Sequence, residues 1–419
     1  MILLLSGLKV GGSIHDPNDG VLWNATYSID VNETIGQARF YHLRVPLSLP
    51  LDDSLLMPLV ILLHGGSGNA SNFEHQTRLG EAAAARGYIV VYGEGVDNEP
   101  PNGVRTWNAG KLIRHSPALA GVWCASPSPF THSVHVTGSC CGLTADASGS
   151  PSRLKADDSN YLRAVLADLT TRGIPYNFSR VFATGHSNGA FMAYRAACEL
   201  DDPGLAGIAV SAGSWGYING TSCLDRATDD SHWIWNGTKR ESCGEPQWET
   251  ELPQWFPCGA SAGNKSSNFP SVLAFQGMQD QHIYYGGGSG NEALVKNGYD
   301  MPYPPFEYAI DRSAALAKGC DASTMQRVVT FTNSSEASSE DTTTCETYVG
   351  SDCVGRANVT QCISTSNGHY WPGNSPPQCD ETDPAYSPAL CAYMLLELGG
   401  TTSTISATDA ALSFFASVP

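Results

Sequence analysis

The chain has 419 residues and a formal net charge of −18, although only 15% of its residues are charged. This acidic balance argues against nucleic acid and anionic membrane surfaces as partners. No apolar run approaches the roughly 18 residues that a membrane-spanning helix needs, so we expect no transmembrane segment. The length exceeds that of most single domains, but one domain with insertions reaches this size.

Segments with strand and helix patterns alternate along the chain. Residues 22–46 alternate apolar and polar side chains, as edge strands do, whereas residues 59–64 form a near-continuous apolar run typical of a buried strand. Further segments predict helices over 74–86, 157–171 and 407–416, and strands over 88–92, 206–211, 271–276, 327–331 and 345–349. This alternation predicts an α/β fold, with a mostly parallel sheet and helices on both faces.

A G-x-S-x-G pentapeptide places Ser187 between a short strand pattern and an apolar helical pattern. In that context the serine lies on a strained turn at the carboxyl edge of a sheet. Gly185 and Gly189 let strand and helix approach closely, because they lack a Cβ. Ser187 is therefore the candidate nucleophile, with an ordinary turn serine as the alternative. A serine hydroxyl also needs a base, an orienting acid and oxyanion donors.

The candidate acid is Asp280, which comes just after the predicted strand 271–276 and so lies at the same sheet edge as the serine. It follows the serine along the chain, as the acid does in hydrolases with such a serine turn. Asp157 and Asp158 are alternatives. They precede the serine, however, and resemble the first turn of a helix, where carboxylates are stabilised in any case.

The candidate base is His369, which lies late in the chain in a glycine-flanked loop that Pro372 keeps from being helical. Among the eleven histidines, His64 and His186 lie inside other motifs, where we expect structural or supporting roles. His282 neighbours the candidate acid.

The predicted strand 59–64 ends in His-Gly-Gly, a loop that can point backbone N–H groups at an oxyanion alongside the N–H of Asn188. Aromatic residues near these motifs are candidates to line the substrate pocket, although loop aromatics are as often simple packing. The candidates are Trp107, Trp371 and Tyr285.

The chain resembles the secreted α/β-hydrolase esterases that include polyhydroxybutyrate depolymerases and feruloyl esterases. The segments that carry the resemblance are LLHGGSG (62–68), TWNAG (106–110), SCCG (139–142), DDSNYLRAVLADL (157–169), SRVFATGHSNGAFMAYRAACEL (179–200), FQGMQDQHIYYGGG (275–288) and NGHYWPG (367–373). They span most of the chain between residues 59 and 373. The resemblance implies a triad of Ser187, Asp280 and His369, with the oxyanion donors at Asn188 and Gly66.

The chain departs from the family pattern in two places. TWNAG and CCG are nearly contiguous in the family, whereas residues 111–139 separate them here. After the acid, residues 281–284 read Gln-His-Ile-Tyr where the family has small residues and proline. These departures leave the catalytic residues in place and bear on the substrate.

We expect residues 1–21 to be an N-terminal extension and residues 22–419 to form a single α/β-hydrolase catalytic domain. Insertions are expected at 111–139, 213–268 and 379–404. The second insertion carries five tryptophans (215, 233, 235, 248 and 255) and follows the nucleophile region, so it predicts an aromatic flap over the pocket. The alternative is a surface excursion that never touches substrate.

Thirteen cysteines without a CxxC spacing predict disulfides in an oxidising compartment rather than a metal site, and the odd number leaves at least one cysteine over. The apolar N-terminus is too short for a complete signal peptide and lacks a basic region, so we read it as the remnant of one. N-x-S/T sequons exceed chance and predict a glycosylated, secreted, extracellular protein. They lie at Asn24, Asn32, Asn69, Asn177, Asn219, Asn236, Asn264, Asn333 and Asn358.

The predicted function is a serine carboxylic-ester hydrolase that forms an acyl-enzyme on Ser187. Hydrolysis of feruloyl esters on wall polysaccharide is the first choice, because an aromatic-rich pocket suits a cinnamoyl ring. Polyester depolymerisation is the alternative, and a non-catalytic binding protein with the same fold is a minor one. This chemistry requires no metal and no organic cofactor.

Overall fold

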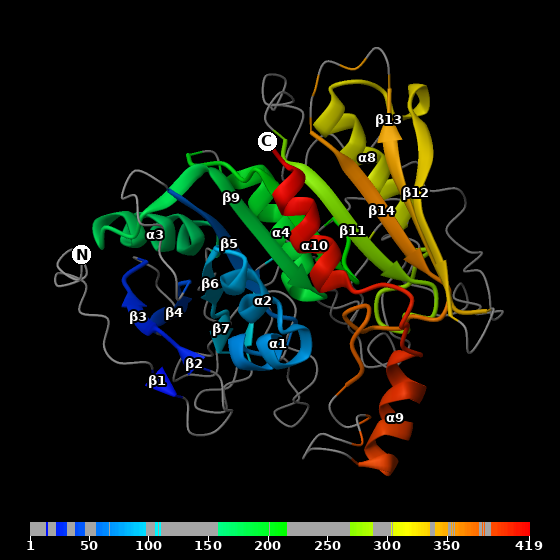
Figure 1. Ribbon diagram of the computed structural model, residues 1–419, viewed down its shortest axis with the longest axis horizontal. Helices are drawn as coiled ribbons and strands as arrows, with labels where there is room; N and C mark the ends of the chain where they lie inside the picture. Colours follow the sequence, from blue (N-terminus) through cyan, green and yellow to red (C-terminus); the bar gives the residue numbers. More distant parts are fainter. Residues whose placement is uncertain are drawn as a thin grey trace, which may run out of the picture.

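The computed structural model describes residues 14–15, 22–31, 38–46, 56–66, 68–97, 105–107, 109, 158–200, 202–215, 269–287, 303, 305–335, 340–350, 353, 355, 357–376, 379, 381 and 387–419 (Figure 1).

A ten-stranded sheet forms the centre of the fold (Figure 1). Its strands are β3 (Ala25–Ile29), β4 (Arg39–Arg44), β5 (Met57–Leu63), β6 (Ile89–Gly93), β9 (Tyr176–His186), β10 (Gly207–Ser211), β11 (Ser271–Gly277), β12 (Gln326–Ser334), β13 (Thr342–Val349) and β14 (Val359–Ser364). They lie in the order β3-β4-β6-β5-β9-β10-β11-β14-β13-β12. The stretch from β6 to β14 is parallel, and an antiparallel pair extends it at each end.

Helices cover both faces of this sheet (Figure 1). One face carries α3 (Asp158–Thr171), α4 (Asn188–Glu199) and α8 (Phe306–Lys318), and the other carries α1 (Ala70–Thr77), α2 (Leu79–Ala85) and α10 (Ala407–Ser417). The remaining elements are α9 (Pro388–Leu398), the short helix Ala322–Thr324, and the two-residue strands β1 (Ile14–His15), β2 (Leu22–Trp23), β7 (Val96–Asp97) and β8 (Arg105–Thr106). This is the α/β-hydrolase fold that the sequence predicted.

The apolar run of β5 is explained by its place in the middle of the sheet. Leu59, Ile61 and Leu63 pack with the helices of one face, whereas Val60 and Leu62 pack with those of the other. Side chains alternate along a strand, so a parallel strand that is covered on both sides must be apolar at every position. The loop that follows β5 therefore starts from a strand that is buried on both faces.

The single helix predicted over residues 74–86 is wrong, because the structure has two helices that meet at Arg78. That residue adopts a left-handed backbone conformation with φ 49°. The buried carboxylate of Glu74 accepts hydrogen bonds from the backbone N–H groups of Gly80 and Glu81, both at 2.9 Å. It thus caps the second helix, whose first N–H groups have no partner within the helix.

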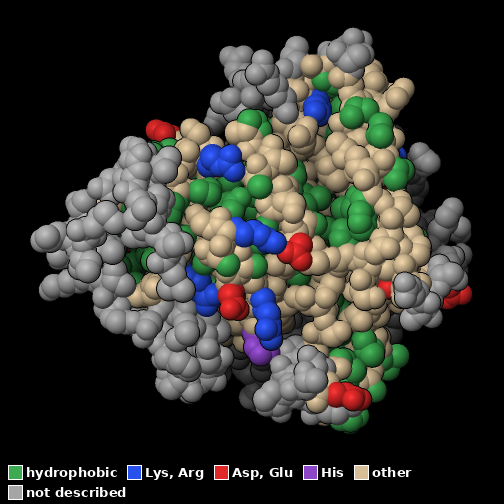
Figure 2. All heavy atoms as spheres, viewed as in Figure 1, with side chains coloured by type: hydrophobic (Ala, Val, Ile, Leu, Met, Phe, Trp, Pro, Cys, Tyr) green, Lys and Arg blue, Asp and Glu red, His purple; other side chains and the backbone are tan. Residues whose placement is uncertain are grey.

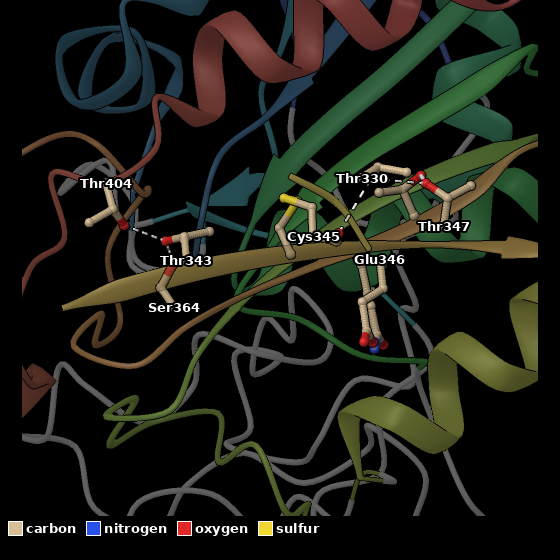
Figure 3. Close-up of a disulfide and its surroundings, with 10 residues drawn as sticks. Thr330, Thr343, Cys345, Glu346, Thr347, Ser364 and Thr404 are labelled. Carbon is tan, nitrogen blue, oxygen red and sulfur yellow. Dashed lines mark hydrogen bonds between the residues drawn. A yellow bond between two sulfur atoms is a disulfide. The ribbon is translucent and has the colours of Figure 1, made fainter. Parts of the chain in front are cut away.

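At one end of the sheet, the antiparallel strands β12, β13 and β14 are linked by a disulfide and by threonine hydroxyls (Figure 3). Cys345 of β13 is bonded to Cys362, directly opposite on β14. The hydroxyl of Thr347 lies 3.3 Å from that of Thr330 on one side and 2.8 Å from that of Thr360 on the other. Side-chain contacts therefore link all three strands.

Disulfides are the observed use of the described cysteines, as the sequence predicted. Cys320 is bonded to Cys353 and Cys379 to Cys391, and Cys198 is also disulfide-bonded. The other cysteines lie outside the described residues. Figure 2 shows a face whose side chains are mostly uncharged, in keeping with the low charged fraction. Within the described ranges, no helix is long and apolar enough to cross a bilayer.

Replacing both Cys345 and Cys362 by alanine should lower the free energy of unfolding by about 3 kcal/mol, because this disulfide closes a loop of 17 residues. Urea denaturation of the variant and the wild-type protein, both under non-reducing conditions, measures the difference. An unchanged midpoint would show that β13 and β14 do not depend on this link.

Candidate active site

The structure places Ser187 on a sharp turn between β9 and α4. Its backbone has φ 54° and ψ −122°, a conformation that non-glycine residues rarely adopt. A Cβ on Gly185 would lie 2.4 Å from the backbone of Gly189, and a Cβ on Gly189 would lie 2.0 Å from the carbonyl oxygen of Leu63. Only glycine fits at either position. The strand–turn–helix predicted from the pentapeptide is confirmed.

Asp280 lies in the turn after β11, with its side chain fully buried. One carboxylate oxygen accepts hydrogen bonds from the backbone N–H groups of His282 (2.8 Å) and Ile283 (2.7 Å). The Nδ1 atom of His369 lies 2.9 and 3.0 Å from the two carboxylate oxygens. The structure thus brings the predicted acid and the predicted base together.

Burial raises the pKa of Asp280 from 3.8 to about 7. The backbone hydrogen bonds from Ile283 and His282 act in the opposite direction, because they favour the ionised form. The protonation of Asp280 therefore changes near neutral pH, beside the ring of His369.

The loop that carries His369 is hydrogen-bonded to the end of α9 and to the residues just after it. The backbone N–H of His369 donates to the carbonyl oxygen of Leu398 at 2.6 Å, and that of Gly368 donates to Gly400 at the same distance. The buried carboxamide of Asn367 donates to the carbonyl oxygen of Tyr370 at 3.0 Å. These hydrogen bonds hold the backbone of the loop in place, and so they position the side chain of His369.

Two further histidines flank the ring of His369. The ring of His282 stacks on it, with centroids 5.0 Å apart and 25° between the planes. The ring of His186 makes a tilted contact with it, with centroids 4.8 Å apart and 48° between the planes. Burial and the nearby His369 lower the pKa of His186 to about 3 and that of His282 to about 4. Both flanking rings are therefore neutral near pH 7.

The candidate oxyanion donors are the backbone N–H groups of Asn188, which follows Ser187 in the chain, and of Gly66. Asn188 begins α4, and its side-chain oxygen accepts from the backbone N–H of Trp107 at 2.7 Å and from the hydroxyl of Thr106 at 3.1 Å. These bonds hold the first turn of α4, where the helix dipole favours negative charge. Gly66 lines the same pocket as Ser187.

A pocket of about 320 Å³ lies beside Ser187 and His369. It is lined by His64, Gly65, Gly66, Gly68, Asn69, Asn72, Phe73, Gln76, His186, Ser187, His282, His369, Tyr370, Trp371, Asn374, Ser375, Pro376, Met394 and Leu398. Ser187, His369, Gly66 and Trp371, all named from the sequence, therefore share one cavity.

Other residues named from the sequence lie elsewhere. Trp107 is fully buried, and its indole N–H donates to the carbonyl oxygen of His64 at 2.9 Å, so it supports the loop that follows β5. The hydroxyl of Tyr285 donates to Glu307 at 2.7 Å, away from the lining of the pocket. Asp158, an alternative acid, pairs with buried Arg39 at 2.5 Å, and Asp157 lies outside the described residues.

Of the three predicted insertions, the structure describes the start of the second and much of the third. Residues 111–139 lie outside the described residues, as does 213–268 after Trp215. Trp215 is buried and donates its indole N–H to the carbonyl oxygen of Ala309 at 2.9 Å, so this tryptophan packs in the core. The third insertion forms α9, which brings Met394 and Leu398 to the pocket.

Sequence reasoning missed α9 as a wall of the pocket. The available signal was a helix start, in which Ser387 caps the first turn and Pro388 follows it, ahead of a segment that is apolar on all sides. An apolar helix that buries none of its residues in the core is unusual for a surface element.

Comparisons with known proteins give structural matches alone. No family model matches the sequence, and no curated protein matches it. An acetyl xylan esterase from Aspergillus awamori is 14% identical with a TM-score of 0.42, over 83% of this chain and 94% of that one. An S-formylglutathione hydrolase from Agrobacterium tumefaciens is 16% identical with a TM-score of 0.34, over 65% and 80%. At such values, activity has to be argued from the site itself.

Replacing His282 by alanine should lower kcat for a p-nitrophenyl ester about five- to tenfold and leave KM within about twofold, because an aromatic contact of about 1 kcal/mol that positions His369 is lost. His282→Phe keeps a flat ring and should retain most of the activity. Steady-state kinetics at pH 8 measures both variants. Equal losses in the two would show that stacking does not position His369.

Proposed function

We propose that this protein is a serine carboxylic-ester hydrolase that is acylated on Ser187. The observation that carries the proposal is the hydrogen-bonded pair of Asp280 and His369 at a pocket that Ser187 also lines. A nucleophile on a strained turn, an imidazole and a buried carboxylate are the parts that acyl transfer needs.

In the proposed reaction, the Ser187 hydroxyl oxygen attacks the ester carbonyl carbon while Nε2 of His369 takes its proton. Nδ1–H of the same ring is held by Asp280, which fixes the tautomer and stabilises the imidazolium. Backbone N–H groups of Asn188 and Gly66 receive the oxyanion. His369 returns the proton to the departing alcohol, and a water molecule activated by His369 then releases the acid.

The proposed substrate is a hydroxycinnamoyl ester of wall polysaccharide, as in feruloyl esterases. Aromatic and apolar groups in the pocket support this, since Phe73 and Trp371 meet edge to face at 5.8 Å and Met394 and Leu398 form a further apolar wall. A planar aromatic acyl group packs well against such surfaces. The pocket volume falls at the low end of the range for small-molecule sites.

Polyester depolymerisation is the second candidate, and α9 is the observation that favours it. Leu390, Tyr393 and Leu396 of this helix are exposed, and the same helix forms a wall of the pocket. An exposed apolar patch of this kind suits contact with an insoluble aliphatic surface.

We also propose that the protein is secreted. The disulfides support an oxidising compartment. Two of the predicted glycosylation sites, Asn333 and Asn358, are exposed in the structure, and the carboxamide nitrogen of Asn333 donates to the carbonyl oxygen of Thr404 at 2.9 Å.

A substrate panel tests the activity and its class together. We expect turnover of hydroxycinnamoyl esters to exceed that of p-nitrophenyl butyrate and of a polyhydroxybutyrate film. Ser187→Ala should lower all ester hydrolysis by about four to six orders of magnitude. Ser413→Ala, an exposed serine on α10, is the matched control and should keep wild-type rates. If fluorophosphonate fails to label the wild-type serine, the protein is a binder and not an enzyme.

The activity should fall as pH drops below about 7, because burial raises the pKa of Asp280 to about 7 and only the ionised carboxylate stabilises a protonated His369. We therefore expect kcat/KM to decline about tenfold per pH unit well below pH 7. A profile that stays flat down to pH 5 would contradict the assigned pair.

A further inference from the structure

The pocket beside Ser187 has two walls of unlike chemistry. One wall is a row of carboxamides along α1, namely those of Asn69, Asn72 and Gln76. The other is apolar and comes from α9, with Met394 and Leu398. Figure 1 shows α1 and α9 at the same end of the molecule, below α10 in that view.

The carboxamide row follows from the spacing of its residues on α1. Asn69, Asn72 and Gln76 are three and four positions apart, so they lie on one face of the helix. Phe73, next to that face, is buried and anchors the helix against Trp371. Asn72 and Gln76 are exposed, and both line the pocket.

The wall is held firmly at both ends of α1. At its start, the side-chain oxygen of Asn69 accepts from the backbone N–H of Asn72 at 2.8 Å. At its end, the hydroxyl of Thr408 donates to the carbonyl oxygen of Thr77 at 2.8 Å, and the Asn374 carboxamide donates to the carbonyl oxygen of Gln76. The carboxamides are thus presented on a fixed helix, which keeps the entropic cost of binding low.

A carboxamide offers one acceptor and two donors without carrying charge. Such groups match vicinal hydroxyls, each of which both donates and accepts. Asn374 and Ser375, which also line the pocket, extend the same chemistry. An aliphatic polyester repeat has no hydroxyl along its chain to use these groups, whereas a sugar has several.

We propose that the α1 wall is the subsite for the alcohol half of the ester, that this half is a sugar or another neutral polyol, and that Asn72 and Gln76 are its specificity-determining residues. The acyl half then lies against Met394 and Leu398. This inference rests on the proposed function, and it assigns the sugar half of the proposed polysaccharide ester to named residues.

The reaction sequence makes this subsite testable apart from the chemistry. Attack by Ser187 expels the alcohol, so an acyl-enzyme made from a sugar ester is identical to one made from a methyl ester of the same acid. The α1 wall therefore acts on acylation alone. Its effect appears in the ratio of kcat/KM for the two esters.

The experiment measures kcat/KM for feruloyl-arabinose and for methyl ferulate. We expect the wild-type enzyme to prefer the sugar ester at least tenfold. Asn72→Leu and Gln76→Leu should each lower the ratio of sugar to methyl ester about fivefold, the worth of one neutral hydrogen bond. Gln326→Leu is the matched control, because Gln326 is exposed on β12 outside the pocket. It should leave the ratio unchanged.

The kinetic results distinguish failure of the alcohol subsite from failure of the proposed esterase activity. A wild-type enzyme that hydrolyses both esters with equal kcat/KM, or whose ratio survives both leucine substitutions, overturns the alcohol subsite and leaves the proposed esterase intact. A wild-type protein that hydrolyses neither these esters nor p-nitrophenyl butyrate overturns the proposed function instead. Circular dichroism of the leucine variants confirms that α1 is still folded.

Discussion

The close approach of α4 to the end of β5 is the constraint on which the site depends. Gly189 lies so near the carbonyl oxygen of Leu63 that no side chain fits between them. That contact fixes where α4 begins and holds Ser187 in a backbone conformation that costs on the order of 1–3 kcal/mol. Because β5 leads directly into the loop with Gly66, the same contact sets the nucleophile against the candidate oxyanion donors.

The site also depends on the burial of the Asp280 carboxyl beside His369. Taking a carboxyl out of water would leave it protonated, and the rise of its pKa to about 7 reflects that tendency. Two backbone N–H groups and the ring of His369 offset it. The flanking rings of His186 and His282 stay neutral near pH 7, so they pack against His369 without adding charge that would oppose its protonation in the proposed reaction.

Features set by neighbouring residues in the chain were predictable from the sequence. The turn at Ser187, the strand that ends before Asp280 and the glycine-flanked loop of His369 each have a local signature, and the parallel topology brings their ends to one edge. Features set by distant contacts were not predictable. The break at Arg78 depends on where the Glu74 carboxylate lies, and the stacking of His282 on His369 depends on how two loops meet.

The role of α9 shows why an insertion is hard to read from a sequence. Met394 and Leu398 of α9 line the described cavity, whereas the tryptophan-rich insertion 213–268 lies outside the described residues after Trp215. Leu398 also accepts the backbone hydrogen bond of His369. One helix end therefore supports both the candidate base and the apolar wall. A change in α9 that reshapes the wall would also move His369, so the proposed acyl specificity and the proposed catalytic geometry depend on the same helix end.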